Sequence, residues 1–140
     1  NSIFWGNETD FNFTDKHSGV MVEFNDTEQG VPVKAGVKAV NNLTVDPEFV
    51  DSAKGDFGLA SDSPLVDAGD PSAAYYDPYD KVKYPTPDPE TTPALPPAQG
   101  TIRNDIGAYG GPDAGPIGFV MPTEDDPNTE YIREDVIGTY

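Results

Sequence analysis

Four aspartates that stand close together near the middle of the chain are the residues best placed to bind a metal ion. Calcium takes about six to eight oxygen ligands, mostly carboxylates and carbonyls on flexible loops. This stretch offers both kinds of oxygen, although neither an EF-hand nor a nonapeptide calcium repeat is present. The sequence therefore predicts calcium as the one candidate cofactor, held by Asp67, Asp70, Asp77 and Asp80.

The same stretch contains a pair of carboxylates that suggests glycoside hydrolysis. That reaction needs two carboxylates about 5 to 9.5 Å apart, and Asp67 and Asp70 are the candidates. However, the segment Asp-Ala-Gly-Asp-Pro is also a natural turn, in which aspartates bond to the nearby backbone. His17 is the only histidine, so neither a zinc site nor a catalytic triad can be built around it. We assign no catalytic residue and favour a protein without enzyme activity.

Tyrosines gather in a proline-rich stretch, residues 72–100. Proline lacks a backbone donor, so this stretch is predicted to be a long loop with polyproline II segments. Its tyrosines are candidates for contact with a ligand such as a polysaccharide, and the alternative is that they pack the loop onto the body. These candidates are Tyr75, Tyr76, Tyr79 and Tyr84.

The charge balance restricts the partners. Acidic residues number 25 and basic residues 8, which gives a net charge of −17. Nucleic acid and anionic membrane surfaces are not expected as partners, because both need a basic surface. No run of the sequence is long and apolar enough to span a membrane. Four Asn-x-Thr sequons, at Asn7, Asn12, Asn25 and Asn42, suit an extracellular or cell-surface location.

Short apolar runs separated by polar turns indicate an all-β fold. The runs are too short for helices and are rich in β-branched and aromatic residues. Asn, Asp and Gly stand between them, and these residues tolerate the left-handed conformations of tight turns. The predicted strands lie in residues 2–5, 11–13, 19–25, 31–33, 37–40 and 105–109.

Five motifs follow one another in a familiar order. They are Asn1–Asn7, Asp46–Asp51, Gly55–Leu59, Ser63–Gly69 and Asp105–Tyr109. Together they resemble the C-terminal region of bacterial right-handed parallel β-helix repeat proteins of the choice-of-anchor Q type, whose fold is similar to that of the pectate lyases. The resemblance implies a secreted or surface-displayed solenoid that ends in this chain. Pectate-lyase-like catalysis needs calcium ligands and a base, and no basic residue here stands in a motif similar to that arrangement.

The predicted organisation is a set of terminal β-helix coils with their cap over residues 1–111, followed by an extended tail over residues 112–140. A terminal coil needs a cover, because an open strand edge pairs with other chains. The first coil is expected to be open, since the chain starts inside a strand motif at Asn1. Either coils precede it in a longer protein, or a strand from a neighbour covers it.

The sequence thus favours a non-enzymatic extracellular structural or adhesive protein, one subunit of a head-to-tail filament or surface assembly. The expected partner is another copy or another surface protein. One alternative is the C-terminal part of a polysaccharide lyase or hydrolase whose catalytic coils lie upstream, and another is a carbohydrate-binding module. The residues predicted to carry assembly are Ile3, Trp5, Val20 and Val22 on the receiving edge, and Phe119, Val120, Ile132 and Val136 in the tail.

Overall fold

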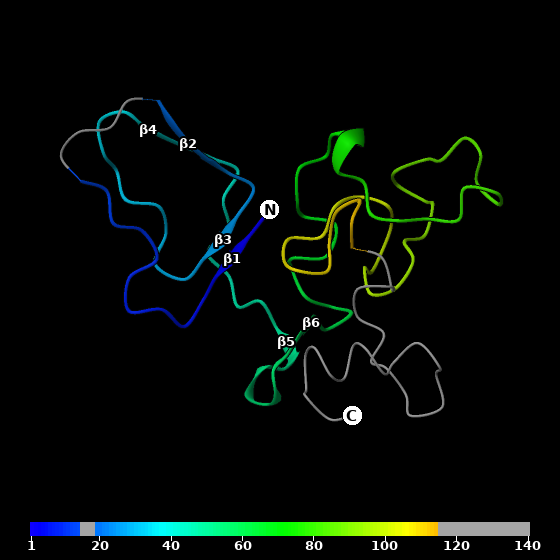
Figure 1. Ribbon diagram of the computed structural model, residues 1–140, viewed down its shortest axis with the longest axis horizontal. Helices are drawn as coiled ribbons and strands as arrows, with labels where there is room; N and C mark the ends of the chain where they lie inside the picture. The colour runs from blue at the N-terminus through cyan, green and yellow to red at the C-terminus, as the bar shows by residue number, and fades with distance from the viewer. Residues whose placement is uncertain (15–18, 115–140) are drawn as a thin grey trace, which may run out of the picture.

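The computed structural model describes residues 1–14 and 19–114 and has an all-β architecture with short strands. No α-helix occurs in these ranges, which contain only two single 3-10 turns, η1 and η2. In Figure 1 strands β1 to β4 lie on one side of the molecule, the β5–β6 hairpin follows, and residues 60–114 form the other side. The elements are β1 Ile3–Phe4, β2 Val20–Glu23, β3 Asp26–Thr27, β4 Val37–Val40, β5 Phe49–Asp51, η1 Ser52–Lys54, β6 Asp56–Leu59 and η2 Ala73–Tyr75.

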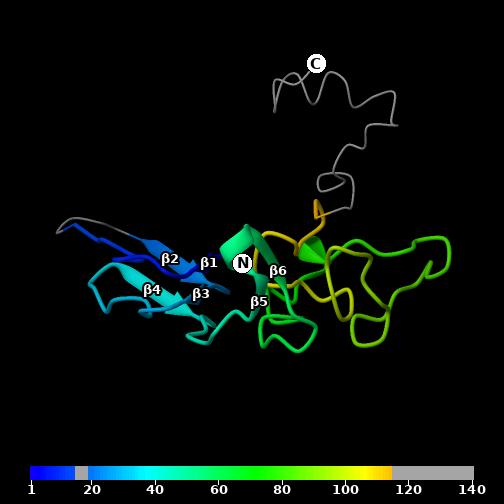
Figure 2. The same cartoon turned by 90° about the horizontal axis from the view of Figure 1, so that it is seen from below.

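The first four strands form two parallel pairs. β1 pairs with β3, and β2 pairs with β4 over four residues, from Val20 opposite Val37 to Glu23 opposite Val40. An isolated parallel bridge joins Asp26 to Leu43 on the other side of β3. Residues 20–26 therefore run parallel to residues 37–43. The pairs β1–β3 and β2–β4 lie side by side (Figure 2).

A repeat of 17 residues relates these two passages. Val20 pairs with Val37 and Asp26 with Leu43, and both separations are 17 residues (37 − 20 and 43 − 26). Left-handed backbone recurs at the same interval, at Gly19 and Gly36 with φ of 72° and 82°. The two stretches, residues 19–27 and 36–44, share Gly-Val at their start and Asn-x-Thr at their end. The same local geometry is thus encoded twice.

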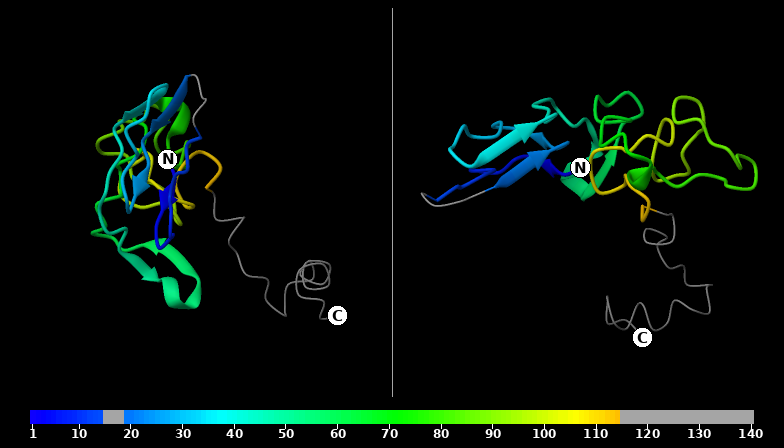
Figure 3. Two further views of the ribbon diagram at one scale, coloured as in Figure 1. Left: turned by 90° about the vertical axis from the view of Figure 1, so that its left-hand side faces the viewer. Right: turned by 90° about the horizontal axis from the view of Figure 1, so that it is seen from above.

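The β5–β6 hairpin is antiparallel, with Phe49 opposite Leu59 and Asp51 opposite Asp56. Gly55 closes it with φ of 80°, a conformation that glycine adopts without steric cost. The rings of Phe49 and Phe57 meet edge to face, with centroids 5.4 Å apart. The hairpin lies between the two sides of the molecule, as the right-hand view of Figure 3 shows.

The hydrophobic core lies where the two sides of the molecule meet. Leu65 and Ile106 are fully buried and Leu59 nearly so, and Ile3 of β1 packs against them. The Asn1 amide oxygen accepts a hydrogen bond of 2.8 Å from the backbone N–H of Asp70, which also joins the two sides. The start of the chain is therefore held by residues far from it in sequence.

Three of the predicted strands are absent, and those predictions were wrong. Residues 11–13 and 31–33 have no strand pairing, and Val33 is fully exposed. Residues 105–109 form bends and a turn, because the N–H of Ile106 bonds to Leu65 and that of Gly110 bonds back to Gly107. Gly107 has φ of 127°, which a strand does not use. The described residues keep the all-β class but do not form a continuous β-helical solenoid.

Candidate functional site

Two asparagines 17 residues apart hold the stacked turns together. Asn42 Oδ1 accepts hydrogen bonds from the N–H of Asn25, at 3.0 Å, and from Asn25 Nδ2, at 3.2 Å. Asn25 Oδ1 in the same way accepts from the N–H of Ser2, 23 residues earlier in the chain, at 2.9 Å. Asn25 Nδ2 also donates to Glu23 O in its own turn, whereas Asn42 Nδ2 donates to Val22 O of the preceding strand β2. This asparagine ladder, Asn25 and Asn42, satisfies turn groups that the short strands leave unpaired.

We expect Asn25→Ala to destabilise the protein by about 1–3 kcal/mol. The variant removes the amide oxygen that accepts from the Ser2 N–H and the Asn1 amino group, and the amide nitrogen that donates to Glu23 O and Asn42 Oδ1. Thermal unfolding followed by circular dichroism measures the loss. Asn12→Ala is the matched control, since the Asn12 side chain is exposed. Equal melting temperatures for the two variants would show that the ladder contributes nothing.

The outer edge of β1 is the second feature of this region. The N–H groups of Asp26 and Glu28 donate to Ser2 O and Phe4 O, both at 2.9 Å. Backbone groups of successive strand residues face opposite sides, so the N–H and C=O of Ile3 point away from β3. Among the described residues, β1 has no strand partner besides β3, and β2 none besides β4. No residue within 1–14 or 19–114 bonds to the N–H or C=O of Ile3, so the strand edge presents one donor and one acceptor there.

A groove with mostly apolar walls lies beside this edge. Its volume is about 370 Å³. Trp5 and Ile3 line it from the β1 side, Phe49 and Phe57 from the hairpin, and the loop at Gly107 completes it. Phe57 is 49% exposed, so the groove opens to solvent. We call these five residues the aromatic groove.

On the side of the molecule formed by residues 60–114, three aspartates connect the loops through hydrogen bonds. Asp77 is 1% exposed and accepts hydrogen bonds from the N–H groups of Gly111 and Asp105 and from Asn104 Nδ2. Asp105 accepts from the N–H of Asp67 at 2.7 Å and of Gln99 at 2.8 Å. Its pKa is raised to about 6, mainly because burial disfavours the charged form. Burial also raises the pKa of Asp77 to about 7.

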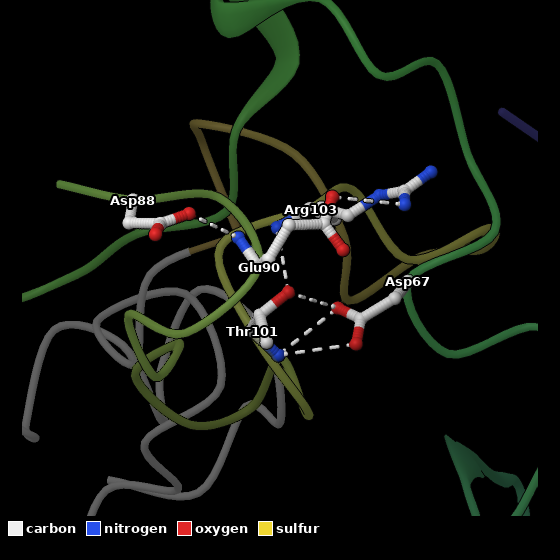
Figure 4. Close-up of polar contacts among 5 residues, drawn as sticks. All are labelled: Asp67, Asp88, Glu90, Thr101 and Arg103. Carbon is white, nitrogen blue, oxygen red and sulfur yellow. Dashed lines mark hydrogen bonds and ion pairs between the residues drawn. The ribbon is translucent and has the colours of Figure 1, made fainter.

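Asp67 completes this network. It accepts from the N–H and the hydroxyl of Thr101, both at 3.0 Å, and has a left-handed backbone with φ of 57°. Figure 4 shows this contact beside the Arg103–Glu90 ion pair of 3.3 Å and the bond from the Glu90 N–H to Asp88. We call Asp67, Asp77 and Asp105 the aspartate network.

The four aspartates predicted to bind calcium each bond to backbone donors instead of converging on one point. Asp67 and Asp77 belong to the aspartate network, Asp70 accepts from the Ser72 N–H at 2.8 Å, and Asp80 accepts from Val82 and Lys83 at 3.0 Å. No group of three or more acidic or histidine residues within 1–14 and 19–114 is arranged to hold a metal ion. Calcium binding stays a prediction that only a titration tests.

The predicted tyrosines separate into two groups. Tyr76 and Tyr79 line one hollow, together with Lys81. Tyr75 is 45% exposed, and the Tyr84 ring has the Lys83 ammonium 5.3 Å from its centroid. The loop brings two of the four tyrosines together.

Of the residues predicted to carry assembly, those of the receiving edge are described. Ile3 and Trp5 line the aromatic groove, Val22 is buried, and Val20 is half-buried in β2. The tail residues Phe119, Val120, Ile132 and Val136 lie outside the described residues.

No family model, curated protein or solved structure matches this chain. No helix within the described ranges is long and apolar enough to cross a bilayer.

Sequence reasoning missed two parts of this region. The asparagine ladder had a signal, because Gly-Val and Asn-x-Thr recur 17 residues apart in 19–27 and 36–44. The role of Asp105 had no such signal, since its partners Asp67 and Gln99 meet it only through the folded loops.

Proposed function

We propose that this chain is a non-enzymatic extracellular structural or adhesive protein that assembles by adding a strand to its β1 edge. The observation that carries the proposal is the outward-facing backbone of Ile3 next to the aromatic groove. An unpaired strand edge is a template for another strand. In strand addition, main-chain hydrogen bonds supply affinity and side-chain pockets supply specificity. The β1 edge would provide the first and the aromatic groove the second.

The fold that we propose for this region is the end of a parallel β-helix. The support is the 17-residue interval between paired strands and the asparagine ladder that repeats at the same interval. In a solenoid each turn packs only on its neighbours, so short strands with ordered polar turns suffice. A strand added outside β1 would extend the same parallel stack.

The occupant that we propose is the segment Ile117–Met121 of a second copy. Its sequence, Ile-Gly-Phe-Val-Met, is short, apolar and uncharged, which suits a groove lined by Trp5, Phe49 and Phe57. A contact between different surfaces of identical chains is heterologous and builds a filament unless it closes into a ring. Each copy would thereby donate a strand to one neighbour and accept a strand from another.

A mixed disulfide trap tests this contact, and the absence of cysteine from the chain gives a clean background. One preparation carries Phe57→Cys and a second, with an affinity tag, carries Phe119→Cys. Mixing them under mild oxidation is expected to give a disulfide-linked pair, because strand addition holds the two sulfurs within bonding range. Non-reducing electrophoresis and mass spectrometry of the linked peptide identify the product.

Val82→Cys is the matched control for Phe57→Cys, since Val82 is 93% exposed and does not line the aromatic groove. A linked yield no higher for Phe57→Cys than for Val82→Cys would refute the strand contact. In that event the alternative of upstream coils of a carbohydrate-active enzyme gains support, because such coils would cover β1 within one chain.

A further inference from the structure

A second hollow, apart from the aromatic groove, is lined mainly by the proline- and tyrosine-rich loop of residues 72–100. Its volume is about 370 Å³, within the range of roughly 300 to 1,000 Å³ of small-ligand pockets. Tyr76, Tyr79 and Lys81 line it, with Pro78 and Pro87 as apolar walls. We call these five residues the tyrosine hollow.

We propose that the tyrosine hollow binds a ring of a neutral saccharide. Its residues combine two chemical features that a sugar ring also combines. The tyrosine rings and prolines offer apolar faces, which match the C–H face of a pyranose. The phenolic hydroxyls and the Lys81 ammonium offer hydrogen bonds, which match the hydroxyls around the rim of that pyranose.

The hydrogen-bonding groups of the hollow are available for a ligand. No described residue hydrogen-bonds the hydroxyl of Tyr76 or of Tyr79. The Lys81 ammonium lies 6.0 Å from the centroid of the Tyr79 ring, at the outer range of a cation–π contact. By contrast, the Asp77 carboxylate at the same hollow is already bonded to the backbone of Gly111 and Asp105. Asp77 is thus engaged within the protein, whereas Tyr76, Tyr79 and Lys81 remain to contact a ligand.

The charge of the chain selects the class of saccharide. A net charge of −17 repels a polyanion at long range. The carboxylates of Asp80, Asp88 and Glu90 stand in the same loop and act in the same direction. A uronate polymer is therefore disfavoured, and a neutral hexose polymer is the occupant to which the hollow is suited.

A proline-rich peptide is the competing occupant, because aromatic grooves also bind polyproline II segments. Such a peptide has no backbone donor at its prolines and offers only carbonyl acceptors. A saccharide offers donors and acceptors around the whole ring, so it can satisfy both the oxygen and the proton of each tyrosine hydroxyl. The hydroxyls of Tyr76 and Tyr79, to which no residue of the described ranges bonds, favour the saccharide on this ground.

Isothermal titration with oligomers of glucose, mannose and galactose tests the proposal, with oligogalacturonate and a polyproline peptide as the competing ligands. At least one neutral oligomer is expected to bind with an affinity that Tyr79→Ala lowers at least tenfold. Tyr75→Ala is the matched control, since Tyr75 belongs to the same loop but does not line the hollow. Tyr79→Phe is expected to lose less affinity than Tyr79→Ala, because it keeps the ring and removes only the hydroxyl.

The outcomes separate cleanly once circular dichroism shows that the variants keep the wild-type melting profile. No binding of any neutral oligomer to the wild-type chain overturns the proposal. So does exclusive binding of oligogalacturonate or of the polyproline peptide. An equal loss of affinity in Tyr75→Ala and Tyr79→Ala also overturns it, because the hollow would then not be the binding site.

Discussion

Replacing Asp77 with alanine is expected to lower the melting temperature by more than ~10 °C. Asp77 is 1% exposed, and its carboxylate accepts from Gly111 N–H, Asp105 N–H and Asn104 Nδ2. The variant leaves three buried donors unpaired, and each costs about 1–3 kcal/mol. For a chain of 140 residues, 1 kcal/mol corresponds to about 4 °C. Thermal unfolding by calorimetry measures the difference.

Asp80→Ala is the control for Asp77→Ala. Asp80 stands three residues away and also caps a turn, with bonds of 3.0 Å to Val82 and Lys83, but it is exposed. Water replaces the lost partner at an exposed turn, so a decrease of only a few degrees is expected. A comparable decrease in both variants would mean that burial of Asp77 is not what makes its bonds matter.

Acidification from pH 8 to pH 5 is expected to stabilise the protein. The pKa of Asp77 is raised to about 7 and that of Asp105 to about 6, mainly by burial, against an unfolded value of 3.8. Between about pH 4 and pH 7 the folded state therefore binds more protons than the unfolded state. Stability must then fall as the pH rises through this window. Neighbouring Asp67 acts in the same direction, since its negative charge raises both pKa values.

Urea denaturation at pH 5, 6, 7 and 8 measures this dependence. A shift of one pKa unit corresponds to about 1.4 kcal/mol, so a loss of at least about 1 kcal/mol between pH 5 and pH 8 is expected. The Asp105→Asn variant, which cannot ionise, should show a smaller slope than the wild type. A free energy of unfolding that rises from pH 5 to pH 8 would contradict the assignment, and so would an unchanged slope in Asp105→Asn.

The sequence by itself determined the local features of this protein. The all-β class follows from apolar runs too short for helices, such as residues 19–25 and 37–40, because side-chain branching and run length act on neighbouring residues. The Asp70 contact followed from its residue type, because its carboxylate accepts from the Ser72 N–H two residues on. The turn interpretation of Asp67 and Asp70 rested on the same local grounds, whereas calcium binding by the loop aspartates stays a prediction.

Only the tertiary structure decided which distant residues meet. The strand predicted at 105–109 failed because its backbone bonds to Leu65 and Asn1, and a residue pattern carries no information on such partners. The network of Asp67, Asp77 and Asp105 joins three loops, and nothing in the sequence pattern connects these residues to one another. Likewise, Tyr76 and Tyr79 share a hollow that Tyr75 does not line, because the path of the loop sets which rings converge. Burial and long-range register arise from the whole chain, whereas turns and strand propensity arise from a few adjacent residues.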